Sequence, residues 1–367
     1  MGFFMFSTIV GLAALGTFGK KGSGGDSLAP SELTPAMYWK PSGEKTVRCE
    51  LCPNACVLAD GQIGQCKARK NIGGKLYSMV FGRVSSVHLD PIEKKPLYHF
   101  LPGSQAYSYG TTGCNLRCKF CQNWQISQVF PWEVPTRAMT PAQIVEEARL
   151  AGARSIAYTY NEPIISYEFT LETAKLAHRS GLKNVMISSG FINPGPLEEL
   201  LHYLDAFKVD LKGFDERFYG HLTAASLSPV LANLKIIRKA GVWLEIVNLV
   251  IPGENDSDED FTNLTRWIKE NLGTEVPLHF TRFHPDYKLV NSPPTPIETL
   301  TRARAIAMRQ GLKYVYTGNV PDPGGSATLD PATGETVIER RGFFVEKNLI
   351  GKNGRAPSGS KIAGVFE

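Results

Sequence analysis

Short apolar segments rich in β-branched and aromatic residues alternate with longer amphipathic segments from about residue 105 to residue 316. This alternation predicts β-strands separated by α-helices, and strands joined in this way run parallel with right-handed crossovers. The expected strands cover residues 106–110, 155–160, 184–188, 206–211, 242–250, 277–283 and 313–316. So many units indicate an α/β fold built on a partial or full (β/α) barrel of parallel strands.

Helix boundaries are visible between these strands. Thr140 and Ser257 have side chains typical of N-caps, and Gly152 and Gly311 stand where helices should stop. The expected helices cover residues 141–151, 164–180, 258–271 and 297–310. Because active sites of such barrels gather at the C-terminal ends of the strands, polar residues at those ends are the first candidates for function.

The composition narrows the class of protein. Among 367 residues, 43% are hydrophobic and 20% are charged, which excludes a disordered chain and a polytopic membrane protein. The net charge is +5, and the basic residues are spread along the chain without a concentrated stripe, so we expect no nucleic-acid partner. The seven cysteines are odd in number and clustered, which favours metal ligation in a reducing compartment and predicts a cytoplasmic protein.

Residues 3–18 form an apolar stretch that is followed by Lys20 and Lys21. The stretch is shorter than the ~20 residues that a membrane-spanning helix prefers, and the usual export and lipidation signals are incomplete. It is either a membrane-associating segment on the cytoplasmic side, an artefact of the assigned start site, or an extension of no consequence.

Three cysteines follow the first expected barrel strand with the spacing C-x3-C-x2-C, at Cys114, Cys118 and Cys121. Each iron of a [4Fe–4S] cluster takes one thiolate, so this triad could hold three irons and leave the fourth open. An open coordination position is typical of catalytic metal sites. The alternatives are a zinc knuckle with a distant ligand or a set of redox cysteines.

The triad also resembles a known family signature. Phe120 precedes the last cysteine, and C-x3-C-x-aromatic-C is the motif of the radical S-adenosylmethionine (SAM) enzymes. Longer motifs resemble one branch of that family, the radical SAM member of the AmmeMemoRadiSam system, which is similar to pyruvate formate-lyase activating enzymes. These motifs cover residues 90–99, 121–124, 158–163, 210–212, 251–253 and 280–285.

The resemblance implies an oxidoreductase that uses a [4Fe–4S] cluster and SAM. In such enzymes SAM binds the open iron, and one electron splits it into methionine and a 5′-deoxyadenosyl radical that abstracts hydrogen. The resemblance further implies a reductant such as flavodoxin or ferredoxin, and a protein or peptide substrate such as a glycyl residue of a partner.

The resemblance also assigns candidate residues around SAM. The expected cofactor-binding residues are Phe120, Asn161, Glu162, Ser189, Asp210 and Lys212. Ser189 stands where related enzymes have asparagine, so it keeps a hydroxyl but loses an amide. Arg282 and His284 alternate near the end of a late barrel strand and are candidates for catalysis or substrate binding. A structural role is the alternative for His284 and for His99.

A second group of cysteines precedes the barrel, at Cys49, Cys52, Cys56 and Cys66. Four thiolates close the shell of either a tetrahedral zinc ion or a second iron–sulfur cluster, and the sulfur donors alone do not choose between them. With zinc the site would tie a small module to the barrel, and with iron it could relay electrons.

We therefore expect four segments. Residues 1–25 are a hydrophobic N-terminal segment and linker, 26–100 a cysteine-rich metal-binding module, 101–320 the radical SAM barrel, and 321–367 a degenerate ribbon-like tail. Relatives often carry two Cys-Pro-x-Cys knuckles in that tail. Here Asp330, Thr333, Ala356 and Gly359 occupy the ligand positions, so we expect no metal there.

Two other classes of function remain open at this stage. One is an iron–sulfur electron-transfer protein, which would normally close all four positions of each cluster. The other is a metal-binding interaction protein without SAM chemistry, for which a barrel is an unusually large scaffold.

Overall fold

The computed structural model describes residues 33–367, and its centre is an eight-stranded sheet in the order β16-β15-β14-β13-β12-β11-β9-β8. Seven strands are parallel: β9 (Gln105–Gly110), β11 (Ser155–Tyr158), β12 (Lys183–Ser188), β13 (Ala206–Asp210), β14 (Trp243–Val250), β15 (Leu278–Arg282) and β16 (Val315–Gly318). They confirm all seven strands expected from the sequence. Strand β8 (Ser86–Pro91) is antiparallel to β9, and within residues 33–367 the sheet stays open between β8 and β16, so the barrel is partial.

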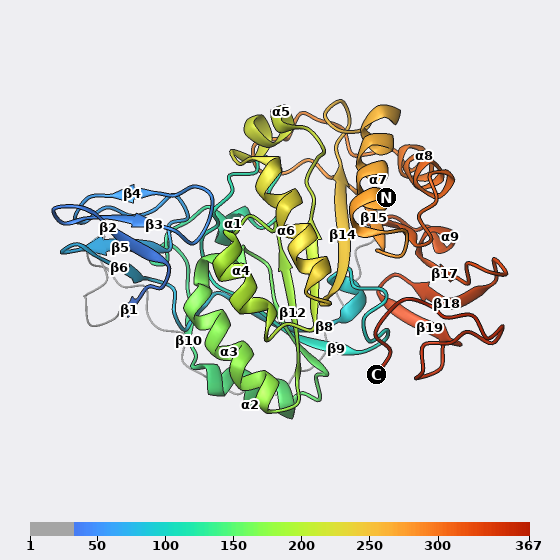
Figure 1. Cartoon of the computed structure of the whole chain (residues 1–367), viewed down its shortest axis with the longest axis horizontal. Coiled ribbons are helices and arrows are strands. Elements are labelled where there is room, and N and C mark those ends of the chain that lie inside the picture. The colour runs from blue at the N-terminus through green and yellow to red at the C-terminus, as the bar shows by residue number, and fades with distance from the viewer. Residues whose placement is uncertain (1–32) are drawn as a thin grey trace, which may run out of the picture.

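Helices pack on the outside of the curved sheet, as Figure 1 shows for α3, α4 and α6. The longer helices are α2 (Pro141–Leu150), α3 (Tyr167–Arg179), α4 (Pro194–Leu201), α6 (Leu227–Lys239), α7 (Asp258–Leu272) and α8 (Ile297–Arg309). Short helical turns are η2 (Ile92–Lys94), α1 (Trp124–Ser127), η3 (Pro163–Ser166), α5 (Glu216–Phe218), η4 (Tyr219–Thr223) and α9 (Pro323–Ser326). This arrangement gives each buried strand an apolar helix face to pack against.

Local sequence signals fix where two of these helices begin. Thr140 and Gln143 form a capping box at the start of α2, and Ser257 and Asp260 form another at the start of α7. Each box satisfies backbone N–H groups that the first helical turn leaves without a partner. The N-caps read from the sequence are therefore confirmed.

Residues 33–84, which we call the N-terminal module, form two small sheets beside the barrel. One contains β1 (Thr34–Pro35), β6 (Lys75–Ser78) and β5 (Arg69–Ile72), and the other contains β2 (Trp39–Gly43), β3 (Thr46–Cys49) and β4 (Val57–Leu58). A further short strand, β7 (Arg83–Val84), pairs with β10 (Arg137–Ala138). Strand β8, which falls within the expected module of residues 26–100, pairs with β9 of the large sheet.

The C-terminal sheet lies at the opposite end of the molecule in Figure 1 and contains β17 (Thr328–Leu329), β18 (Thr336–Arg341) and β19 (Phe344–Asn348). Arg340 of β18 is buried and donates to the carbonyl oxygen of Tyr98, which ties this sheet to the base of the barrel. Asp330 accepts hydrogen bonds from the hydroxyls of Ser358 and Ser360. Polar contacts thus join the turn at Asp330 to the turn at residues 356–360.

The apolar segment at residues 3–18 lies outside the described part of the chain. Within residues 33–367, no helix combines the length and the apolar character needed to cross a membrane.

Candidate active site

A cavity of about 190 Å³ opens at the C-terminal ends of the central strands and is lined by all three cysteines of the C-x3-C-x2-C triad. The other predicted residues on its wall are Phe120, Asn161, Glu162, Ser189, Asp210 and Lys212. These residues come from the loops after β9, β11, β12 and β13. The sequence therefore predicted a set of side chains that the fold brings to one place.

The triad lies on a loop that packs closely against the N-terminal module. Gly113 has φ of +93°, and a Cβ atom added there would lie 2.3 Å from the carbonyl oxygen of Cys66. The Cys114 N–H donates to that same oxygen at 3.2 Å. Glycine is therefore required at this position both by the backbone conformation and by the close approach of the N-terminal module.

The thiols of the triad suit metal ligation. Burial raises the pKa of Cys114, and it raises the pKa of Cys118 to about 12 although the Lys212 ammonium opposes that rise. Thiols in such a place lose their protons when a metal binds them. Within residues 33–367, no three ligand-type side chains already form the shell of a single metal ion. In a cluster, by contrast, each thiolate binds a different iron, and three thiols on one loop fit that donor set.

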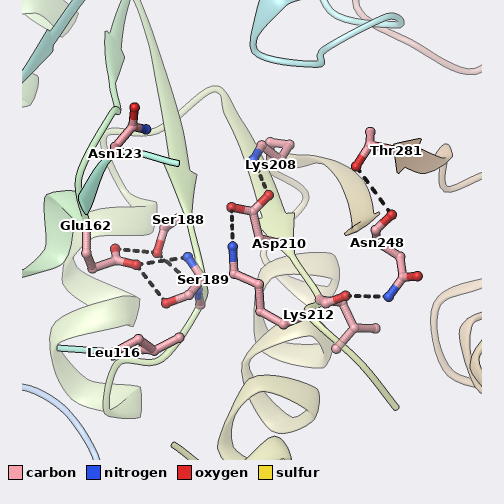
Figure 2. A network of polar contacts seen from close by, with 12 residues as sticks. Leu116, Asn123, Glu162, Ser188, Ser189, Lys208, Asp210, Lys212, Asn248 and Thr281 are labelled. Carbon is pink, nitrogen blue, oxygen red and sulfur yellow. Dashed lines mark hydrogen bonds and ion pairs between the residues drawn. The ribbon is translucent and has the colours of Figure 1, made fainter. Parts of the chain in front are cut away.

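Glu162 is buried beside the triad, and its carboxylate is held by the loop after β12. One carboxylate oxygen accepts from the Ser188 hydroxyl at 2.6 Å, and the other accepts from the Ser189 N–H at 2.9 Å and hydroxyl at 2.7 Å. Figure 2 shows the carboxylate facing both serines. Burial raises the pKa of Glu162, while these hydrogen bonds act in the opposite direction.

The residues before Glu162 are fixed in an unusual conformation. Tyr160 has φ of +73°, a region that side chains other than glycine rarely adopt, and its hydroxyl donates to Asp90 at 2.6 Å. The Asn161 amide donates to the carbonyl oxygen of Gly113 at 2.9 Å. The Asn161 side chain therefore holds the triad loop against the end of β11.

Three charged residues alternate along the end of β13, and two of them, Asp210 and Lys212, line the same cavity. Asp210 forms ion pairs with Lys208 and with Lys212, the second at 3.0 Å, as Figure 2 shows. Burial alone would raise the pKa of Asp210, but the two lysines outweigh it and lower this pKa to about 2. The same pairing raises the pKa of Lys212, so Lys212 stays a cation at the cavity wall.

Three residues of this site were not predicted from the sequence: Lys208, Ser188 and Asn123. Lys208 shares the alternation of Asp210 and Lys212, and that spacing could have revealed it. Ser188 adjoins the predicted Ser189. Asn123 donates to the carbonyl oxygen of Tyr160, and nothing in the local sequence pattern predicts this contact.

The two candidate catalytic residues from the late strand do not line the cavity. The Arg282 guanidinium donates to the carbonyl oxygen of Thr295, and His284 is exposed beyond the end of β15. His99 lies at the other end of the barrel, where its ring nitrogens contact the Ala363 carbonyl and the Tyr316 hydroxyl. A role for Arg282 or His284 in catalysis or substrate binding stays a prediction.

The second group of cysteines lies together in the N-terminal module. Cys49 and Cys52 are buried, and Cys56 and Cys66 are half-buried. Burial raises the pKa of Cys52 and of Cys66 to about 12. The buried Arg69 guanidinium approaches the Cys49 sulfur at 3.9 Å, so a cation adjoins these thiols.

Comparison with known proteins agrees with this architecture. Residues 108–265 match the sequence profile of the radical SAM superfamily. An uncharacterized protein of Methanocaldococcus jannaschii is 47% identical over 84% of this chain and 92% of its own length. Pyruvate formate-lyase 1-activating enzyme of Escherichia coli K12 is 23% identical over 56% of this chain and 89% of its own.

Among solved structures, a radical SAM methyltransferase from Sphaerobacter thermophilus aligns with 60% of this chain and 68% of its own, at 18% identity and a TM-score of 0.48. The sequence match spans the triad loop, Glu162 and the Lys208–Asp210–Lys212 row. Residues 108–265 are a radical SAM domain, and the chain is an enzyme that reductively cleaves SAM at a [4Fe–4S] cluster to generate a 5′-deoxyadenosyl radical.

Proposed function

We propose that Cys114, Cys118 and Cys121 anchor the catalytic cluster and that the surrounding cavity binds SAM. The observation that carries this proposal is the meeting of the three thiols, Glu162 and Lys212 on one cavity wall. When bound, the reduced cluster supplies the electron that splits the sulfonium of SAM. The protein's own residues then have to bind, orient and shield the cofactor.

The charges of the cavity suit the methionyl end of SAM. The Glu162 carboxylate is an acceptor for the ammonium group, and the Lys212 ammonium is a partner for the carboxylate group. Asp210 holds Lys212 in place, and Ser189 orients Glu162. Asn161 fixes the position of the triad loop through its hydrogen bond to Gly113, and Phe120 provides apolar surface beside the cysteines.

We further propose that the radical abstracts hydrogen from a protein or peptide, in the manner of a glycyl-radical activating enzyme. The similarity to pyruvate formate-lyase 1-activating enzyme and to benzylsuccinate synthase activating enzyme of Thauera aromatica supports this choice. The motifs at residues 90–99 and 158–163 support membership in the AmmeMemoRadiSam branch. A flavodoxin or ferredoxin would supply the electron.

We also propose a second metal centre, zinc or iron–sulfur, on Cys49, Cys52, Cys56 and Cys66. Arg69 is 1% exposed, and its Nε–H has no hydrogen-bond partner within the described residues. An orphaned buried donor is costly unless an acceptor is present. Thiolate ligands beside Arg69 would supply such an acceptor.

Anaerobic reconstitution with iron and sulfide tests the proposal. We expect the intact protein to release 5′-deoxyadenosine and methionine from SAM when a strong reductant is added. A Cys118→Ala variant should fold but lose cluster absorbance and SAM cleavage, since one of three anchors is gone. If the intact protein cleaves SAM no faster than this variant, the assignment of the triad is wrong. A cluster that is reduced without SAM cleavage would instead indicate an electron carrier.

A further inference from the structure

The positive charge of the protein is concentrated in the N-terminal module. Residues 33–84 contain eight Lys and Arg against three Asp and Glu, which gives this segment a formal charge of +5. The whole chain also carries +5, so all remaining residues together are neutral. Arg69 is buried, but Lys45, Arg48 and Lys75 are exposed. A surface of this kind attracts acidic partners and speeds their association.

We infer that the N-terminal module is where electrons enter the enzyme. Its four cysteines hold a redox-active iron–sulfur centre, which takes one electron from an acidic donor protein docked on the module and passes it to the catalytic cluster. This inference rests on the proposed function of the triad, and it chooses iron–sulfur over zinc for the second centre.

The two groups of cysteines are joined directly. The Cys114 N–H donates to the Cys66 carbonyl oxygen at 3.2 Å, so one hydrogen bond links a proposed ligand residue of each centre. The side chain of Asn54 donates to the carbonyl oxygen of Asn115 at 2.8 Å, which adds a second link between the same two loops. Gly113 lets the chains approach this closely. A short bonded route thus runs from the module to the triad.

Part of the four-cysteine group lies close to the protein surface. Cys56 is half-buried, and the neighbouring Val57 is 57% exposed. Val57 pairs with the exposed Arg48 across β3 and β4, so a cation lies at this surface. A donor attracted by the basic residues would therefore dock close to the second centre.

The charged residues around the second centre suit a metal centre that gains negative charge when it is reduced. Arg69 forms a buried ion pair with Glu168 of α3 and also approaches Cys49 at 3.9 Å. The second oxygen of Glu168 has no hydrogen-bond partner within residues 33–367. A guanidinium shared in this way can offset the negative charge that a cluster gains on reduction, whereas zinc undergoes no such change.

The electron step is balanced without a proton. The donor protein loses one electron, the second centre gains and then loses it, and the catalytic cluster receives it. SAM is the final acceptor, and its carbon–sulfur bond breaks to give methionine and the 5′-deoxyadenosyl radical.

The first test measures metals and reduction in a variant without the triad, Cys114→Ala/Cys118→Ala/Cys121→Ala. We expect this protein to keep iron and sulfide after reconstitution, and its visible absorbance should bleach when reduced flavodoxin is mixed with it. Zinc without iron, or iron that flavodoxin does not reduce, would overturn the inference.

The second test compares two reductants with the intact triad. In a Cys52→Ser/Cys56→Ser variant, the rate of SAM cleavage driven by reduced flavodoxin should fall much further than the rate driven by dithionite, which is small enough to reach the triad. Equal loss with both reductants would show that the module only positions the triad, and an unchanged rate with both would exclude a relay. Failure of intact protein with dithionite would instead disprove the proposed function itself.

A charge reversal that leaves all cysteines in place provides the third test. Lys45→Glu/Arg48→Glu should slow flavodoxin-driven reduction about tenfold at low salt, and the effect should fade as salt screens the charges. The matched control is Lys347→Glu/Lys352→Glu, which makes the same change of charge on exposed residues of the C-terminal region. Equal slowing in both variants, or in neither, would argue against docking on the module.

Discussion

The Glu162 carboxylate accepts several hydrogen bonds from the protein itself. Ser188 and Ser189 occupy both of its oxygens, and the Ile164 N–H reaches one of them at 3.3 Å. The carboxylate is therefore oriented in advance, and an incoming ammonium group would add to a network that burial has strengthened. Orientation of this kind lowers the cost of ordering the site when the cofactor binds.

We expect a Glu162→Gln change to weaken SAM binding by about 10- to 100-fold, because hydrogen bonds to charged groups contribute about 1.5–3 kcal/mol. Equilibrium dialysis of SAM against the reconstituted protein measures this. Glu198→Gln, at an exposed position on α4, is the matched control and should bind SAM normally. Equal affinities in the two variants would remove Glu162 from the site.

The close approach of Gly113 to Cys66 can be tested by substitution. We expect Gly113→Ala to displace the triad loop and to lower the iron content after reconstitution, since its Cβ would lie 2.3 Å from the Cys66 oxygen. Gly152 also has positive φ, at +68°, but no atom lies within 4 Å of its Cβ position. Gly152→Ala should therefore cost about 1 kcal/mol of stability and keep its iron. If both variants bind iron equally, the contact does not set the loop.

Some site residues could be predicted from the sequence and others could not. The cysteine spacing and the alternation of Asp210 and Lys212 are local patterns, and the fold places both on the cavity wall. The pairing of Tyr160 with Asp90 joins residues 70 positions apart, and no local pattern encodes it. Arg282 had the right spacing but turns to Thr295 instead, because the chain after β15 offers it a backbone acceptor.

At the scale of elements, the N-terminal module is attached to the barrel by a buried ion pair. Arg69 of β5 and Glu168 of α3 are 1% and 4% exposed, and Arg69 also donates to the carbonyl oxygen of Met37. The strands and helices themselves follow from hydrophobic periodicity, so they could be predicted. The small sheets of the module could not, because their strands are too short to show a period.

We expect Arg69→Met to lower the free energy of unfolding by about 3–5 kcal/mol, because it leaves the Glu168 carboxylate buried without its cation. Anaerobic urea denaturation measures this loss. Arg69→Met/Glu168→Leu should regain part of it, since the unpaired charge is then gone. Arg48→Met, at an exposed position of β3, is the control and should change stability little. An equal loss in the single and double variants would contradict a buried-pair mechanism.

At the scale of the whole molecule, the base of the barrel is sealed by polar groups from distant parts of the chain. His99, Glu245 and His279 are fully buried there, with Tyr316 and with Arg340 of the C-terminal sheet. Burial lowers the pKa of His99 to about 4, so His99 is neutral in the folded protein at neutral pH. Burial raises the pKa of Glu93 in the same region to about 7.

We expect His99 to make the folded state less stable in mild acid. Between pH 6.5 and pH 4 the unfolded chain binds a proton at His99 that the folded chain does not bind, so the free energy of unfolding falls by up to about 3 kcal/mol as the pH drops. Glu93 acts in the opposite sense between pH 4.5 and pH 7. Comparing wild type with His99→Gln by urea denaturation across this range isolates the histidine, since both proteins keep Glu93. A constant stability difference between them would contradict the assignment.

Within residues 33–367, β8 and β16 do not pair, and this gap bears on which substrates can reach the site. A closed barrel can be entered only at its two ends, whereas an open barrel can also be entered along the gap between its edge strands. A hollow of about 520 Å³ lies between the end of β16 and the C-terminal sheet, lined in part by Asn319 and Phe343. An open sheet leaves one flank of the molecule without a wall of strands, which is compatible with the protein or peptide substrate that we propose.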